Sequence, residues 1–448
     1  MKQITTVVGI LLSALILMSC ANGRYPYPKS DLGEETWRAQ VETHSSAWAM
    51  KADDWFLDGG PSRAKIENDR AGYNAAISRN SVRVTNFIGI RAIGDFQVQI
   101  TGDPDRNTLT IEGPNDAVRA VIVKMNNNVL CLEQADDAPA NMGQVIVHIN
   151  MRHLESLEHN GLGSVEGVRL DSNHLRVENT GCGNIFLAGR MDVKSIISHG
   201  PGTVNVFTIC SNDTEIVTTD TGNVNLAARR YVTLRSIKHK GSGDINVIGA
   251  VDGNLRVSAE GKGKIGVYGR VNIREIKASG KTCVFIASSD SPAPCIYVYD
   301  DARVGIDGNA GSLNGYTTRT ARLLTRYLHT QNSYVQASGV SHMNVTAYDK
   351  IFATANDYAT IYFYGDPNIM TAFKRGRGVV VNMGTPSSPE EVIVSREPSR
   401  RVSRAARHHR MPSGEPNIKI GQNDLVGPPK FVWRKGRLVE VSDNHMYV

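Results

Sequence analysis

The sequence lacks the motifs that mark common catalytic and metal sites. It contains neither His-Glu-x-x-His, which holds zinc in many proteases, nor Gly-x-Ser-x-Gly, which carries the nucleophile of many hydrolases. The 12 histidines are scattered along the chain. One stretch, Gly261–Gly266, matches a dinucleotide-binding fingerprint, but that fingerprint needs a helix after its turn, and a strand-like pattern follows here. We therefore predict no metal, no cofactor and no enzyme activity.

Aromatic residues and net charge are also low. Aromatic residues make up 6% of the 448 residues, whereas hydrophobic residues reach 41%, so the chain can bury a core that is rich in Val, Ile and Leu. The formal net charge of +6 is mild for a chain of this length. It does not predict a nucleic-acid partner.

Cysteine is scarce, with six residues and no pair at the spacing of zinc ligands. If Cys20 is modified, as argued below, five cysteines remain, and that odd number leaves at least one unpaired. An exported protein can form disulfides. We predict a disulfide between Cys283 and Cys295, which flank the turn-rich stretch from Ser288 to Pro294.

A repeat of about twenty residues fills the middle of the chain. Gly-x-Gly turns mark its clearest copies, at Gly161, Gly181, Gly200, Gly241 and Gly261. Four positions after each corner stands an apolar residue: Val165, Ile185, Val204, Val224, Ile245, Ile265, Val284, Val304, Leu323, Met343, Ile361 and Val379. A second apolar ladder stands four positions before the corners and fails at Gly315, Ala353 and Thr371. Two ladders locked to one corner indicate a stacked repeat rather than chance.

The spacing inside each repeat predicts short strands. Alternate apolar residues, such as Ile245 and Val247, place one strand face inward. Gly corners supply the backbone conformations that sharp turns need. One turn cannot bury its inner face alone, so turns stacked about 4.8 Å apart form the core. The prediction is an all-β chain, a β-solenoid of about 20 residues per turn and parallel sheets. Twelve turns would span roughly 55 Å.

The N-terminal stretch is typical of a lipoprotein signal peptide. A charged start is followed by the apolar run from Val7 to Met18, which is too short to span a membrane comfortably. The run ends in Leu-Met-Ser-Cys and resembles the bacterial lipobox, which implies acylation of Cys20 after removal of residues 1–19. In Gram-negative lipoproteins Asp at the next position favours the inner membrane, so Ala21 implies an outer-membrane anchor. Several acyl chains give strong attachment.

Composition divides the remainder of the chain. Residues 20–81 are predicted to be a tether with short helices, and 82–384 the solenoid with an N-terminal cap that includes a hairpin of residues 96–100 and 109–111. Residues 385–416 contain six Arg between 395 and 410 and are predicted to be a disordered linker, which either contacts an anionic surface or is a solvated spacer. Residues 417–448 contain a predicted β-hairpin. It docks either on the open end of the solenoid or on a partner, because an isolated hairpin is marginal in water.

Several stretches resemble the bacterial head GIN domain family, described as adhesin-like autotransporter heads. These are the Asn86-Phe87 opening, the strands at 96–100 and 109–113, the Gly-Ser-Gly-Asp-Ile unit at Gly241, and the closing stretches at Tyr364–Pro367 and Gly376–Val379. The resemblance covers roughly residues 82–384. It implies a right-handed parallel β-helix in an exported, surface or periplasmic setting, and it supplies no catalytic residues. The chain departs from it where Asp300, Arg319 and Asp357 replace corner glycines.

Two sets of outward polar residues are candidates for function. The first is the row Asn205, Asn225 and Asn246, which either forms a hydrogen-bonded ladder or faces a glycan or protein partner. The second is a set of carboxylates, because enzymes on this scaffold place paired acids along an outer groove. Its members are Asp220, Asp244, Asp300 and Asp301, although Asp at a corner is more often a turn former.

The predicted function is a non-catalytic, lipid-anchored envelope protein of a Gram-negative bacterium, periplasmic or surface-exposed. Its solenoid would act as a scaffold for binding, adhesion or assembly, with the membrane and a protein or glycan as partners. Two alternatives stay open: a structural subunit of an envelope secretion complex, and a polysaccharide-active β-helix enzyme that uses the carboxylates.

Overall fold

The computed structural model describes residues 77–84, 86–103, 105, 107–384, 430–434 and 437–441. All described residues belong to one unit, Ala47–Val448. The predicted signal peptide, Cys20, the tether up to residue 76 and the basic linker lie outside the described residues.

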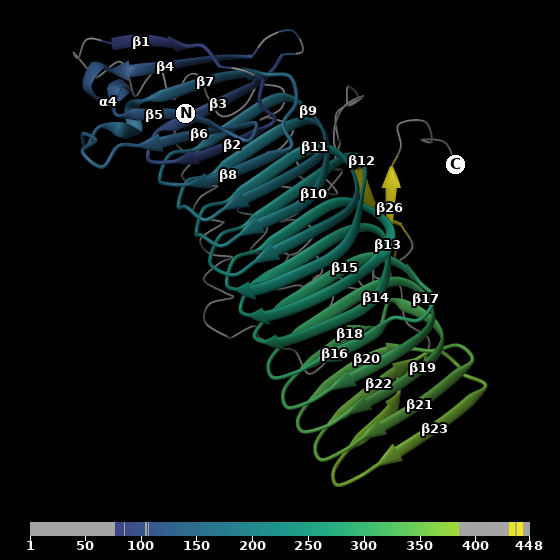
Figure 1. Ribbon diagram of the computed structural model, residues 1–448. Helices are drawn as coiled ribbons and strands as arrows, with labels where there is room; N and C mark the ends of the chain where they lie inside the picture. The colour runs from purple at the N-terminus through teal and green to yellow at the C-terminus, as the bar shows by residue number, and fades with distance from the viewer. Residues whose placement is uncertain are drawn as a thin grey trace, which may run out of the picture. The chain divides into compact units, whose positions relative to one another are not determined.

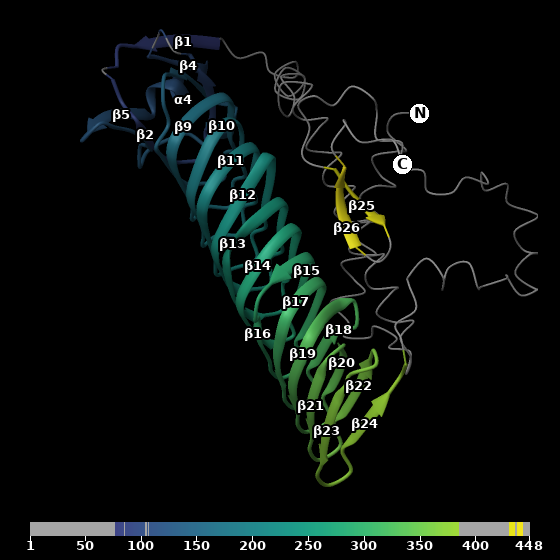
Figure 2. The ribbon, with the colours of Figure 1, turned by 90° about the vertical axis from the view of Figure 1, so that its right-hand side faces the viewer.

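The described strands from β8 to β24 stack into a β-solenoid, as predicted (Figure 1). Neighbouring turns pair in parallel along the whole repeat. The strands of the stack are β8 (Ser156–Asn160), β9 (Val165–Asn179), β10 (Ile185–Ser198), β11 (Val204–Thr218), β12 (Val224–Gly241), β13 (Ile245–Gly261), β14 (Lys264–Gly280), β15 (Cys283–Ser291), β16 (Cys295–Val298), β17 (Arg303–Thr317), β18 (Arg322–Thr325), β19 (Leu328–Ala337), β20 (His342–Thr346), β21 (Lys350–Ala355), β22 (Thr360–Tyr364), β23 (Ile369–Lys374) and β24 (Val379–Asn382). Figure 2 shows the same stack from the side.

Both predicted apolar ladders form the core. Ile185, Val204, Val224 and Ile245 are paired in register along one sheet, and each has 0% of its surface exposed. The second ladder is also in register, and Gly315 stands in it opposite Ile296, where the sequence shows a gap. The stacked apolar rows therefore make one continuous core, as the repeat predicts.

The last turn corrects the predicted register by one residue. Val380, not Val379, pairs with Ile361, and Val379 is 41% exposed. The reason is the position of the last corner. Gly376, with φ of 70°, takes the place that Asp357 holds one turn earlier with φ of 59°. The corner therefore lies at residue 376 and not at 375.

The corners keep their shape by two different means. At Gly243 the backbone φ is not positive, but a Cβ would overlap the carbonyl oxygen of Gly222 in the neighbouring turn. The later corners are left-handed instead: Asp300, Arg319 and Asp357 have φ of 58°, 58° and 59°. The early glycines are needed because stacked backbones approach closely, and the later corners tolerate side chains at some conformational cost.

The first turn is closed by an N-terminal cap. It contains β1 (Ile77–Val82), β2 (Gly89–Ile93), β3 (Gln97–Gly102), β4 (Thr108–Pro114), helix α4 (Asn115–Arg119), β5 (Val121–Asn126), β6 (Val129–Gln134), a 3-10 turn at Met142–Gln144 and β7 (Ile146–Met151). The predicted hairpin between β3 and β4 is wrong. Strand β7 pairs in parallel with β3 and antiparallel with β4, and so lies between them.

Strands β25 (Lys430–Arg434) and β26 (Arg437–Val441) form an antiparallel hairpin, as predicted. Within the described part of the chain it is the only sheet separate from the solenoid. No helix among the described residues has the length and apolar character needed to cross a membrane.

Candidate functional site

Each turn presents two long outer faces, which we name by their relation to the corner. Face A comprises outward side chains three, five and seven positions after each corner, such as Asn205 and Phe207 in β11. Face B comprises those three and five positions before each corner, such as Arg256 in β13 and Tyr334 in β19. Residues between them in the strand point into the core because successive side chains alternate.

The predicted asparagine row lies on face A and forms a ladder. Asn225 Nδ2 donates to Asn205 Oδ1 over 2.8 Å, and Asn246 Nδ2 donates to Asn225 Oδ1 over 3.0 Å. The three side chains are only 6%, 8% and 8% exposed. The side-chain amides therefore hydrogen-bond to their neighbours in adjacent turns. The ladder stabilises the stack rather than presenting a polar surface.

In the earlier turns, the row of face A seven positions after the corners is apolar and shielded from solvent, whereas the row three positions after them contains Asp244, Lys264 and Arg303. Phe207 is 5% exposed and forms a small hydrophobic cluster with Ala188 and Ala227, separate from the main core. Further along the face, the rings of Tyr268 and Phe285 lie 6.0 Å apart and are 4% and 2% exposed. A row of large apolar side chains on the outside of a sheet is the signature of a contact surface.

The four carboxylates considered for catalysis do not form one cluster: Asp220 and Asp244 belong to adjacent turns, and Asp300 and Asp301 stand further along the stack, where Asp301 accepts a hydrogen bond from the Thr320 hydroxyl. Asp220 and Asp300 stand at corners four turns apart, which is about 19 Å at the spacing of strands, whereas cooperating carboxylates lie within about 10 Å. The side chains also have structural partners. Asp244 Oδ1 accepts the N–H of Lys264 at 2.9 Å, and Asp300 Oδ2 accepts the N–H of Gly280 at 3.1 Å. These acids hold adjacent turns together.

The predicted disulfide is not formed. Cys283 begins β15, and its strand-pairing neighbours are Lys264 and Arg303. Cys295 begins β16 on face B, and its strand-pairing neighbours are Glu275 and Asn314. The two cysteines share a turn, but Cys283 stands on face A and Cys295 on face B. All five cysteines of the described part are thiols.

Histidines that look scattered in the sequence include two that are buried under the corners. His159 Nδ1 lies 2.9 Å from Asn179 Oδ1, and His239 Nδ1 lies 2.6 Å from Thr218 Oγ1. Burial lowers the pKa of both imidazoles below the usual 6.5. Among the described residues no three His, Cys, Asp or Glu side chains are grouped to hold a metal ion. This polar column is an interior support of the solenoid.

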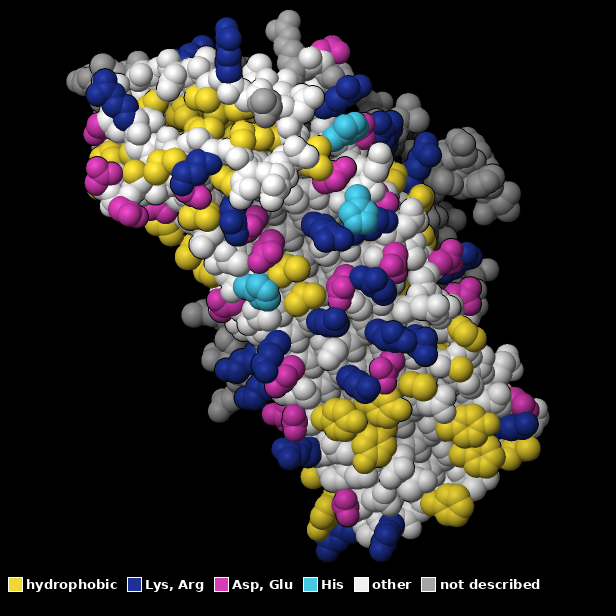
Figure 3. All heavy atoms as spheres, viewed as in Figure 1, with side chains coloured by type: hydrophobic (Ala, Val, Ile, Leu, Met, Phe, Trp, Pro, Cys, Tyr) yellow, Lys and Arg dark blue, Asp and Glu magenta, His cyan; other side chains and the backbone are white. Residues whose placement is uncertain are grey.

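The early half of face B is charged. Lys238 Nζ lies 2.7 Å from Glu215, and this hydrogen bond is the main cause of the lowered pKa of the Glu215 carboxyl. Arg235 contacts the same carboxyl at 2.9 Å. On the side of the solenoid seen in Figure 3, charged side chains cover the middle, and hydrophobic ones gather toward the C-terminal end.

The late half of face B is aromatic. Tyr334 and Phe352 occupy the same row in adjacent turns, with their ring centroids 5.3 Å apart and the planes only 5° from parallel. They are 43% and 36% exposed, and Phe373 in β23 is 62% exposed. Sequence reasoning missed these residues, although their odd spacing from the corner shows that they face outward.

The last turns also leave an open edge. Within the described strands, β23 pairs only with β21, and β24 is joined to β22. Ile369 and Met370 at this edge are 46% and 56% exposed. Apolar side chains beside unpaired strand backbone make this end a candidate surface for another polypeptide.

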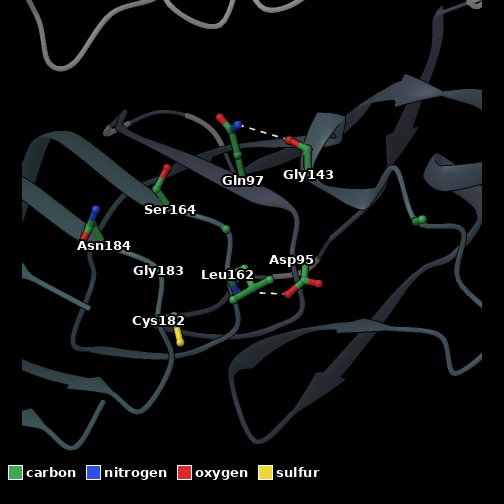
Figure 4. A pocket seen from close by; sticks show the side chains of 10 residues that line it. Asp95, Gln97, Gly143, Leu162, Ser164, Cys182, Gly183 and Asn184 are labelled. Carbon is green, nitrogen blue, oxygen red and sulfur yellow. Dashed lines mark hydrogen bonds between the residues drawn. The ribbon is translucent and has the colours of Figure 1, made fainter. Parts of the chain in front are cut away.

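A shallow pocket of about 380 Å³ lies near the cap (Figure 4). Asp95 and Gln97 project into it, but Asp95 Oδ1 accepts the N–H of Leu162 and Gln97 Nε2 donates to the carbonyl of Gly143. Cys182 is the exposed thiol of its rim. Because the side chains of Asp95 and Gln97 already hydrogen-bond to the backbone, they are poorly placed to bind a ligand in this pocket.

The chain matches the family model described as "Putative auto-transporter adhesin, head GIN domain" over residues 86–270 and 233–367. Together these ranges cover well over half of the chain. No match was found among curated proteins.

Several solved structures are similar. A putative adhesin from Bacteroides fragilis is 15% identical, with a TM-score of 0.20, and the match covers 69% of this chain and 97% of the other. A putative lipid binding protein from Parabacteroides distasonis is 9% identical, with a TM-score of 0.25 and coverage of 69% and 98%. A putative adhesin from Parabacteroides merdae is 12% identical, with a TM-score of 0.22 and coverage of 69% and 97%.

Proposed function

The chain belongs to the head GIN domain family, and from this premise we propose that it is a non-catalytic binding protein of the bacterial envelope. The observation that carries the proposal is the gathering of exposed aromatic and aliphatic side chains over the last turns of a long parallel stack. Tyr334, Phe352 and Phe373 lie on face B there, and Ile369 and Met370 lie at the open edge. A solenoid of this kind is a stiff support for an extended contact surface.

The partner at this surface is a protein. Tyr334 and Phe352 stack face to face, so each ring covers one face of the other, and on their outer sides the neighbours in the same row are Asn314 and Thr371. A sugar stacks on a ring face, whereas ring edges and aliphatic side chains are the usual contents of a protein interface. The adjoining unpaired strand edge adds backbone donors and acceptors that an extended polypeptide can pair with.

Lipid anchorage places this surface in the envelope. The proposal retains acylation of Cys20, supported by the preceding apolar run and the Leu-Met-Ser-Cys stretch, and an outer-membrane location, supported by Ala21. The contact surface lies over the last turns of the solenoid, at the opposite end from the N-terminal cap. The backbone roles of Asp244 and Asp300 support a non-catalytic scaffold.

Site-specific photocrosslinking in native envelopes tests the proposal. A photoreactive residue replaces Tyr334 in one strain and Arg256 in another. These positions belong to one outward row of face B, four turns apart, and both are exposed. We expect a discrete protein adduct from position 334 and none from 256. In a third strain, F352S combined with the probe at 334 should abolish the adduct, because the adjacent ring is lost.

Two results would contradict this function. Equal adducts from positions 334 and 256 would show that the aromatic end is not a specific surface. A glycan adduct without a protein adduct at 334 would make the partner a polysaccharide.

A further inference from the structure

Face A carries one large apolar side chain in each of three consecutive turns, beside a polar row that contains Asp244, Lys264 and Cys283. At the turns where face B carries Arg256 and Lys277, both exposed, face A carries Ile248 and Tyr268. The turn that follows adds Phe285 to face A, which leaves a run of large apolar side chains along three turns. Large apolar side chains on the outside of a sheet need a second layer that shields them from water.

The burial of these side chains agrees with such a layer. Ile248, Tyr268 and Phe285 point away from the core, yet they are only 4%, 4% and 2% exposed. The described strands β1 to β24 form a single sheet wound into the solenoid, and none of their pairings lays a second layer on face A. The one other sheet in the described part is the hairpin of β25 and β26.

The hairpin is two-sided. Its register pairs Trp433 with Leu438 and Phe431 with Glu440, so these residues belong to one side. The opposite side contains Lys430, Arg434 and Arg437 around the Val432–Val439 pair. A two-stranded hairpin is marginal alone, and three large apolar residues on one side give it a surface to bury.

The chain leaves the solenoid at the end of the same face. Val381 of β24 pairs with Tyr362 in the face A row, and Gly365 N–H donates to Gly384 C=O at 2.9 Å. Residues 385–429 then separate the solenoid from the hairpin, and 45 residues reach up to about 150 Å when extended. The turn of Tyr268 is six turns back, which is about 29 Å. The connection is long enough for the hairpin to return along face A.

We propose that the C-terminal hairpin of this chain folds back onto face A and covers Ile248, Tyr268 and Phe285 with the side that carries Phe431, Trp433 and Leu438. The tail then acts as an intramolecular clasp, and its basic side faces solvent. The contact is independent of the aromatic end of face B and of its partner.

Thiol labelling of the full-length protein tests the clasp. Cys283 lies on face A, two residues from Phe285, and Cys295 lies on face B in the same turn; both are partly buried. Labelling at each cysteine is followed by mass spectrometry of its peptide. We expect W433S to raise the labelling rate of Cys283 roughly tenfold or more, because a buried aromatic anchor is lost. The rate at Cys295 should not change.

V432S is the matched control, because residue 432 lies on the opposite side of the same hairpin. It should leave Cys283 as protected as in the wild type. Equal labelling of Cys283 in the wild type, W433S and a chain ending at residue 384 would overturn the proposal. If protection of Cys283 rises with protein concentration, a second copy of the chain covers face A. If protection is lost only when residues 21–76 are removed, the N-terminal segment covers it.

Discussion

The imidazole Nδ1 of His239 lies 2.6 Å from Oγ1 of Thr218 in the preceding turn. The two residues stand at the same place, two positions before their corners, and are 2% and 1% exposed. His159 and Asn179 repeat the arrangement in earlier turns at 2.9 Å. The solenoid therefore contains buried polar side chains that hold its corners in register, and two of them can titrate.

Acidification should destabilise the solenoid through these histidines. Burial lowers the pKa of His159 and His239 in the folded state below the ordinary 6.5. Below pH 6.5 the unfolded chain therefore binds more protons than the folded one, and stability falls as the pH falls. Each histidine contributes at most about 1.4 kcal/mol one pH unit below 6.5. Urea unfolding at pH 7.5, 6.5 and 5.5 measures the effect.

H239N is the variant that isolates this cause, because Asn179 shows that asparagine fits the column. It should flatten the pH dependence of the unfolding free energy between pH 7.5 and 5.5. H199N is the control, since His199 is exposed. If H239N and H199N leave the same pH slope as the wild type, the buried histidine is not the cause.

The corner glycines should be intolerant of a methyl group where turns stack closely. A Cβ at Gly243 would overlap the carbonyl of Gly222, so G243A should lower the unfolding free energy by about 3 kcal/mol through overpacking. At Gly143 the nearest atom would be 3.9 Å away, and G143A should be close to neutral. Thermal unfolding of both variants measures the difference. Equal Tm values for G243A and the wild type would show that the corners relax freely.

The asparagine ladder should contribute to stability rather than to binding. N225A removes both ladder bonds and leaves Asn205 and Asn246 buried without those partners, which should cost about 1–3 kcal/mol. Asn314, exposed on face B, is the control, and N314A should stay within about 0.5 kcal/mol of the wild type. Denaturant unfolding measures both. A neutral N225A would mean that water replaces the ladder.

The fold could be predicted from the sequence because each turn repeats one local rule. Ile245 and Val247 face inward by strand alternation, and the same spacing recurs in each turn. The prediction of strand pairing in the cap was wrong because a strand distant in the sequence takes part in it. The turn at Gly102 suggested that β3 and β4 pair, but β7, more than thirty residues later, lies between them. The last corner lies at Gly376 rather than at residue 375. The left-handed φ of Gly376 sets the register of the last turn, and the apolar residues around it do not.

The candidate site was only partly visible in the sequence. The asparagine ladder on face A follows from spacing, but its burial does not, because alternation tells which way a side chain points and not what covers it. The aromatic row at Tyr334 and Phe352 could have been found by the same alternation. The row is a candidate contact surface because its rings are exposed, and the exposure of a side chain depends on the whole structure. Asp244 looked chemically active, and its bond to a backbone N–H needed three-dimensional geometry.

Acylation of Cys20 remains a prediction from the sequence, and one substitution decides it. Several acyl chains bind a membrane strongly, whereas a polypeptide without them depends on weaker surface contacts. C20S should therefore lose fatty-acid label, move from the membrane to the soluble fraction in high salt, and keep the mass of residues 1–19. High salt matters because the six Arg between residues 395 and 410 can attach the chain electrostatically at low salt. C182S, at an exposed thiol of the solenoid, is the control and should stay in the membrane fraction. If C20S retains label and membrane attachment in high salt, the anchor lies elsewhere in the chain.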